Sequence, residues 1–146
     1  MKKFFIIPLL ASMALTAGVI ALEGGSLMSY LGISAALLTC GVSFLVLLTQ
    51  YTPGEMGSAF AAATGNAAVS DMKKALVFFE TMQRTVIAAG ILGTMIGFIY
   101  VLSKLSDISK TGVGIALSLI TLLYAVVIVT FITVPFIGAI RKKLAA

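Results

Sequence analysis

The sequence predicts an all-α integral membrane protein with four transmembrane helices and a short cytoplasmic helical extension. Of its 146 residues, 60% are hydrophobic and 10% are charged, whereas a soluble domain carries charges at about a quarter of its positions. The mean hydropathy is +1.16. Four uncharged runs are each long enough, at roughly 20 residues, to cross a bilayer as a helix. We therefore interpret residues 1–146 as a single membrane domain.

The composition also excludes several classes of function. A single cysteine cannot form an intramolecular disulfide, and without histidine the chain has no imidazole base or zinc ligand. We expect no enzyme, no metal site and no cofactor. The net charge of +5 comes from basic residues at the ends of apolar runs, where they set membrane topology, so we expect no nucleic-acid partner.

The first two predicted spans form a hairpin, with residues 4–22 and 27–50 on either side of a polar turn. A basic start is also typical of a cleaved signal peptide, but the apolar core of such a peptide is shorter, roughly 7 to 15 residues. Glu23 is interpreted as a solvated residue of the turn. Hydroxyls of the second span can bond carbonyls of their own helix, so they predict no pore. These are Ser29, Ser34, Thr39 and Ser43.

Residues 51–85 form the predicted cytoplasmic connector. Its first part is a linker rich in glycine and alanine. Ser70 is the predicted N-cap of a helix from Asp71, whose carboxylate suits the positive end of the helix dipole. One apolar face predicts that this helix continues unbroken into the third span. The face consists of Ala75, Leu76, Phe79, Met82 and Val86.

The third span, residues 86–103, has its small residues on one face. Residues spaced i, i+3, i+4 and i+7 form one narrow stripe on a helix. A stripe of this kind that includes a GxxxG favours close helix packing in lipid. It consists of Gly90, Gly93, Thr94 and Gly97, of which Thr94 alone has a hydroxyl.

The fourth span, residues 112–138, carries a second small-residue stripe, spaced i, i+4, i+7 and i+11. It consists of Gly114, Ser118, Thr121 and Ala125, with Leu122 beside it. Pro135 predicts a kink or hinge, because proline cannot donate a hydrogen bond to the carbonyl of Phe131.

Two interpretations of the paired stripes stay open. In the first, the stripes are packing faces whose hydroxyls bond their own helices. In the second, the small residues still pack, but a narrow and partly hydrated ion pathway runs along this face. The residues of that pathway are Thr94, Ser118, Thr121 and Leu122, and the packing positions are Gly90, Gly93, Gly97, Gly114 and Ala125.

The acidic residues restrict how such a pathway can work. All five lie at span ends or in connectors: Glu23, Glu55, Asp71, Glu80 and Asp107. An ion-coupled transporter needs an ionisable group inside the membrane, so a small multidrug-type exporter is disfavoured. Proton conduction would therefore use a carboxylate inserted by a partner, or water alone.

The basic residues predict the orientation. Eight of the ten lie on one side of the predicted membrane, at the two termini and in the connector. The other two, Lys104 and Lys110, lie on the opposite side. Both termini and the connector should therefore be cytoplasmic.

The same segments resemble the MotA/TolQ/ExbB proton channel family. The similar stretches are EGGSL (Glu23–Leu27), AGILGTMIGFIYVL (Ala89–Leu102), GIALSLITLLYAVV (Gly114–Val127) and TVPFIGAIRKKL (Thr133–Leu144). They cover nearly the whole chain except the connector. The four-span layout is closer to MotA than to the three-span ExbB and TolQ.

This resemblance implies a homo-pentameric ring in the bacterial inner membrane around a dimer of single-span MotB-, ExbD- or TolR-like partners. The partner carries a membrane aspartate, and Thr94 matches the position that faces this acid. Leu122 matches a fourth-span position that is often threonine, and threonine is kept where the ion is sodium. Leucine there favours protons. Pro135 matches the family's proline near the cytoplasmic end of that span.

Two departures from the family pattern affect the interpretation. The family's proline at the head of the third span falls on Ile87 here. MotA also has a large charged cytoplasmic domain, which residues 51–85 do not provide. We therefore expect a minimal motor subunit with a load other than the flagellar rotor. The alternative is a four-span adaptor or scaffold protein that conducts no ion.

Overall fold

A computed structural model gives the fold and describes residues 2–22, 24, 30–65, 67–103 and 108–145. The chain divides into two units, residues 1–32 and 33–146, and each is described by itself. Every regular element within the described residues is helical, which confirms the predicted all-α class.

The first unit contains helix α1 (Lys2–Leu22), which includes Pro8. Its apolar part, Ile6–Leu22, is shorter than the two long helices of the second unit. After it, Gly24 adopts a left-handed conformation with φ of 73° and donates its N–H to the carbonyl of Ala21. Glu23 and residues 25–29 lie outside the described residues, so the predicted polar turn is described only at Gly24.

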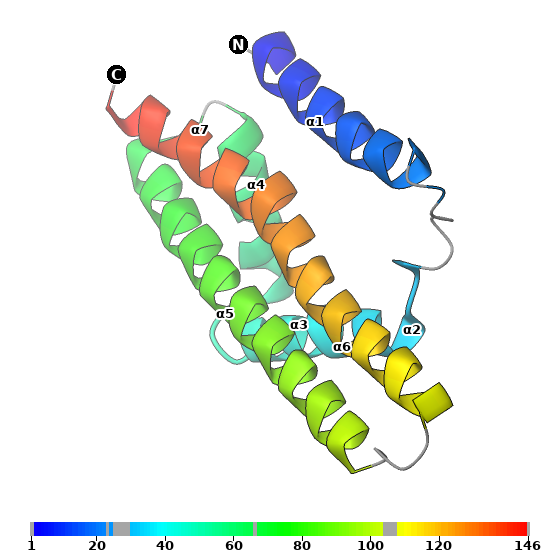
Figure 1. Cartoon of the computed structure of the whole chain (residues 1–146). Coiled ribbons are helices and arrows are strands. Elements are labelled where there is room, and N and C mark those ends of the chain that lie inside the picture. The colour runs from blue at the N-terminus through cyan, green and yellow to red at the C-terminus, as the bar shows by residue number, and fades with distance from the viewer. Residues whose placement is uncertain (1, 23, 25–29, 66, 104–107, 146) are drawn as a thin grey trace. The chain divides into compact units, whose positions relative to one another are not determined.

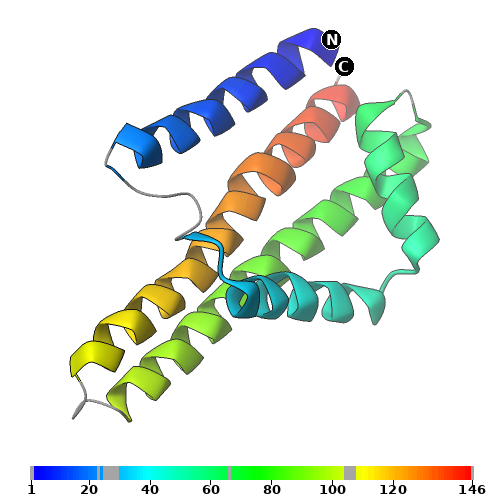
Figure 2. The same cartoon turned by 90° about the vertical axis from the view of Figure 1, so that its right-hand side faces the viewer.

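The second unit is built on a long antiparallel hairpin, which both views show clearly (Figures 1 and 2). One arm is the single helix α5, and the other is α6 continued through a π-helical turn, η3, into α7. Before the hairpin, α2, the π-helical turn η2 and α3 form one stretch that crosses α5, and α4 follows it after a bend of 104°. The bounds are α2 (Ile33–Ala36), η2 (Leu37–Gly41), α3 (Val42–Leu48), α4 (Pro53–Thr64), α5 (Val69–Leu102), α6 (Ile108–Ile128), η3 (Val129–Thr133) and α7 (Val134–Leu144).

Two helices in the described residues are long and apolar enough to cross a membrane, Val69–Leu102 and Thr111–Leu144. The bent pair α2–α3 and α4 would make a third if it counts as one span. The predicted count of four spans stays a prediction. Helix α5 has 34 residues and is about 51 Å long, whereas the hydrocarbon core is about 30 Å thick. About 20 Å of this helix therefore projects beyond the lipid if it stands upright.

The region predicted as a linker contains helix α4. Thr52 is its N-cap: the Thr52 hydroxyl accepts from the Glu55 N–H, and the Glu55 carboxylate accepts from the Thr52 N–H at 2.8 Å. This reciprocal pair is a capping box, with Pro53 favoured at the first helical position. The motif is visible in the sequence, but the glycine and alanine around it led to the linker interpretation.

Helix α5 confirms the predicted unbroken passage from the connector into the third span. The prediction that Ser70 is the N-cap is wrong. The helix begins at Val69, with Ala68 in an extended conformation as its N-cap and no side-chain cap bond. Asp71 does lie in the first turn, where its charge suits the helix dipole. The start of α5 therefore has no side-chain cap.

The core of the second unit lies where α3, α4 and α7 meet the first half of α5. Its centre is aromatic: Phe79 is fully buried and stacks on Phe136, with ring centroids 5.1 Å apart and planes 3° apart. Phe60 of α4 meets both rings edge-on. Such ring pairs add about 0.5 to 1.5 kcal/mol to the burial of their area. The part of α5 before the third span is thus held by a core of its own.

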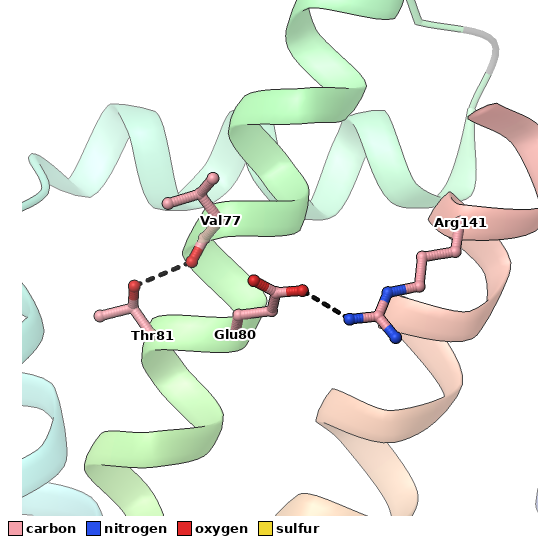
Figure 3. A network of polar contacts seen from close by, with 4 residues as sticks. All are labelled: Val77, Glu80, Thr81 and Arg141. Carbon is pink, nitrogen blue, oxygen red and sulfur yellow. Dashed lines mark hydrogen bonds and ion pairs between the residues drawn. The ribbon is translucent and has the colours of Figure 1, made fainter.

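Two polar links tie the end of α7 to this core. Arg141 Nη2 donates to Glu80 Oε1 of α5 at 2.7 Å (Figure 3). Lys143 Nζ donates to the carbonyls of Ala63 and Gly65 at the end of α4. These three bonds hold basic residues at one end of the hairpin. The connector's basic residues occupy the same end, on the first half of α5: Lys73, Lys74 and Arg84.

We expect Thr52→Ala to fray the start of α4 and to raise the pKa of Glu55. The hydrogen bonds from the Thr52 backbone and hydroxyl hold that pKa below its ordinary value of 4.5. Because the folded pKa is depressed, the box stabilises α4 above the ordinary pKa and loses this effect as pH falls through the folded value. NMR titration of labelled glutamate measures the change.

Ser58→Ala is the control, since the Ser58 hydroxyl bonds only carbonyls of its own helix. An equal change in the Glu55 pKa in this variant would contradict the assignment.

Candidate functional site

The two predicted stripes face each other along the hairpin. Gly90, Gly93 and Gly97 of α5 lie against Ala125, Thr121 and Ser118 of α6, in that order. A Cβ atom built on Gly97 would lie 2.9 Å from the Cα of Ser118, and one on Gly93 would lie 3.0 Å from the Cβ of Thr121. A side chain at either position would force its neighbours to shift. The glycines therefore allow the two helix backbones into direct contact.

Two hydroxyls and a backbone carbonyl meet at the centre of this contact. Thr94 Oγ1 lies 3.3 Å from Thr121 Oγ1 and 3.1 Å from the carbonyl oxygen of Ser118. Thr121 donates to the same Ser118 carbonyl at 2.6 Å. Ser118 donates to Ile115 within its own helix. The structure thus brings together the three hydroxyl residues that the sequence assigned to an ion pathway.

Exposure differs among these hydroxyl residues. Ser118 is 1% exposed and Thr121 5% exposed, whereas Thr94 is only partly buried. A threonine hydroxyl has one proton and two acceptor lone pairs. The Thr94 proton already has acceptors in the carbonyls of Gly90 and Ser118. Thr94 can therefore still accept a hydrogen bond from outside, and a protonated carboxylic acid is a donor of the right kind.

The other predicted site residues lie around this centre. Leu122 is 36% exposed and lies beside the hydroxyls rather than among them. Ala125 is 1% exposed and packs on Gly90, while Gly114 packs on Val101 near the far end of the hairpin. Pro135 is the second residue of α7, directly after the π-helical turn η3, and the helix continues past it to Leu144.

Thr39 is a residue that the sequence interpretation missed. We expected its hydroxyl to bond its own helix, but it donates to the carbonyl of Thr121 at 3.2 Å. That expectation is wrong for Thr39 and right for Ser43, whose hydroxyl bonds the Thr39 carbonyl. Ser34 is exposed, and Ser29 lies outside the described residues. A lone threonine in an apolar run carries no sequence signal for a bond to another helix.

Acidic groups are absent from the centre of the hairpin as far as the structure describes it. Glu55, Asp71 and Glu80 lie on α4 and the first half of α5, at the end that holds the aromatic core. Glu23 and Asp107 lie outside the described residues. Among the described residues, no three His, Cys, Asp or Glu side chains are grouped so that they could hold a metal ion. The described part of the hairpin therefore offers no titrating acid at the Thr94 hydroxyl.

Comparison with known proteins gives two matches. The model of the MotA/TolQ/ExbB proton channel family matches residues 32–146, which include the whole hairpin and the helices packed on it. Motility protein A of Aquifex aeolicus (strain VF5) is 38% identical over 55 residues. Those residues make up 38% of this chain and 22% of that protein, so the likeness to the relative covers about a fifth of its length.

We expect Gly97→Ala to lower the free energy of unfolding by about 1 to 3 kcal/mol, because the new methyl group forces α5 away from Ser118. Gly138→Ala in α7 is the matched control. A Cβ there meets nothing within 4 Å, so this variant should be neutral or slightly stabilising. Unfolding in mixed micelles, followed by circular dichroism, measures both. Equal effects of the two substitutions would contradict a close contact at Gly97.

Proposed function

The chain belongs to the MotA/TolQ/ExbB proton channel family, and from this premise we propose that it is the channel-forming subunit of a proton-driven motor. In this proposal it couples inward proton flow to mechanical work together with a single-span partner. Leu122, at the position where a threonine would favour sodium, supports protons as the ion.

The observation that supports the proposal most is the hydroxyl contact between Thr94 and Thr121. Both threonines lie on the face where the glycines of α5 meet α6. The Thr94 oxygen keeps a lone pair that can accept a hydrogen bond at the edge of that face. A protonated partner acid can donate to Thr94. An ionised acid would instead need the Thr94 proton, for which the carbonyls of Gly90 and Ser118 compete. The face therefore distinguishes the two protonation states of a carboxyl group.

The lack of an acid at this face determines what the partner must bring. Proton relays in membranes are marked by ionisable groups, and the acids of the described hairpin lie only toward its core end. We assign this group to an aspartate in the helix of a MotB-, ExbD- or TolR-like partner. A ring of five copies around two such helices would let successive protonations turn the ring.

The charge distribution supports the orientation that we propose. Arg141 and Lys143 are bonded to the end of the hairpin that also carries Lys73, Lys74 and Arg84. A positive cluster of this kind favours the cytoplasmic side of a bacterial inner membrane. In this orientation both termini are cytoplasmic, and the core of α4, α5 and α7 projects into the cytoplasm. This small core replaces the large domain of MotA, so we propose a load other than the flagellar rotor.

A specific observation favours a second function, that of an adaptor which conducts no ion. The space beside each glycine of the α5 stripe is occupied by a residue of α6 in the same chain. The Ser118 and Thr121 hydroxyls donate to carbonyls of α6 itself. An interface of this kind is complete without a channel. The two functions differ in whether loss of a hydroxyl changes proton flux while assembly stays intact.

We expect Thr94→Val and Thr121→Val each to lower proton uptake by about ten-fold or more while the complex still assembles. Valine keeps the shape of threonine but loses the hydrogen bond, and a buried partner left without its bond costs about 1 to 3 kcal/mol. Uptake into liposomes, read by an internal pH dye and divided by the amount of complex, measures this. Thr49→Val is the control, because the exposed Thr49 hydroxyl bonds only Val46 of its own helix. Unchanged uptake in both test variants would favour the adaptor.

We also expect the chain to co-purify with a single-span protein that carries an aspartate in its membrane helix. Replacement of that aspartate by asparagine should stop proton uptake without releasing the partner, because asparagine keeps the shape but cannot titrate. Native mass spectrometry of the complex gives the subunit numbers. A complex without such a partner, or a partner whose aspartate can be replaced with full uptake, would contradict the proposed motor.

A further inference from the structure

One buried threonine joins the second helical stretch to the hydroxyl site. Thr39 lies in η2, is fully buried, and donates its hydroxyl to the backbone carbonyl of Thr121 at 3.2 Å. The two residues are 82 positions apart in the chain. The bond therefore holds the helix α2–η2–α3 against the part of the hairpin that carries the Thr94 and Thr121 hydroxyls.

The residue before Thr39 contacts the same point of the hairpin. The Cδ2 atom of Leu38 lies 2.7 Å from the position that a Cβ on Gly93 would take. Gly93 also faces Thr121, so its missing side chain makes room for Leu38 and for Thr121 together. Adjacent residues of η2 thus supply an apolar contact and a hydrogen bond to the centre of the α5–α6 contact.

The bond of Thr39 is a property of its position rather than of its residue type. A threonine in a membrane helix can satisfy its hydroxyl on a carbonyl one turn back in its own helix. Thr133 does so: it is equally buried, it also lies in a π-helical turn, and it donates to Val129 at 3.1 Å. Thr39, with the same local geometry, donates to another helix instead.

We propose that Thr39 is a positioning residue for the proton path. By holding the main chain of Thr121, it keeps the Thr121 hydroxyl within 3.3 Å of the Thr94 hydroxyl, where a partner acid is received. Thr39 itself contacts neither the ion nor the acid. The inference rests on the proposed function and extends the conducting machinery from the hairpin to the helix α2–η2–α3.

Three variants of the full chain, each purified with its single-span partner, test this proposal. Thr39→Val removes the donor and keeps the shape, so we expect proton uptake per assembled complex to fall by about five-fold. Thr39→Ser restores a hydroxyl at the same atom and should recover most of the uptake. Thr133→Val is the matched control and should leave uptake unchanged, because the bond it removes lies within one helix.

Each outcome decides whether Thr39 positions Thr121 for proton uptake or only stabilises the folded complex. Uptake that falls in Thr39→Val, recovers in Thr39→Ser and stays normal in Thr133→Val supports the positioning role. Normal uptake per complex in Thr39→Val overturns it, even if less complex is recovered, and so does an equal loss in Thr133→Val. A wild-type complex that takes up no protons overturns the proposed function itself, and this inference with it.

Discussion

At Gly97 the backbones of α5 and α6 come so close that one added methyl group would lie 2.9 Å from the Cα of Ser118. In lipid the helices gain little from hydrophobic contact, so van der Waals packing and hydrogen bonds must hold them together. The glycine stripe provides the first of these and makes the second possible. Only at this separation can the Thr94 hydroxyl of one helix lie within reach of Ser118 and Thr121 on the other. Packing and polar chemistry are therefore one feature of the hairpin.

The length of α5 connects this contact to the rest of the chain. The same unbroken helix carries Phe79, at the centre of the aromatic core, and Thr94, about 22 Å further along its axis. The second arm also reaches both places, with Thr121 in α6 and Phe136 in α7. The two arms therefore pack on each other both at the aromatic core and at the stripes.

The parts predictable from the sequence were those that depend on the period of a single helix. The spacing of Gly90, Gly93 and Gly97 shows in advance which face packs, and the unbroken passage of α5 follows from its continuous apolar face. Features that depend on another helix were not predictable. Thr39 bonds Thr121 because the crossing of α2–η2–α3 places it there. The N-cap of α5 is Ala68 rather than Ser70, and no side-chain bond marks this start. The helix α4 was missed for a different reason, since its capping box was present in the sequence but outweighed by the surrounding glycines.

The hydroxyl site is also satisfied within the chain itself, which bears on how a channel of this kind stays closed. Among the described residues, no buried side-chain nitrogen or oxygen lacks a hydrogen-bond partner. The buried hydroxyls of the described contact therefore need no water to complete their hydrogen bonds. In the proposed motor, an arriving acid would bond the Thr94 hydroxyl at an acceptor lone pair that the internal bonds leave open. In that proposal, the contact between Thr94 and Thr121 is closed without the partner and is also the place where the partner's acid would bind.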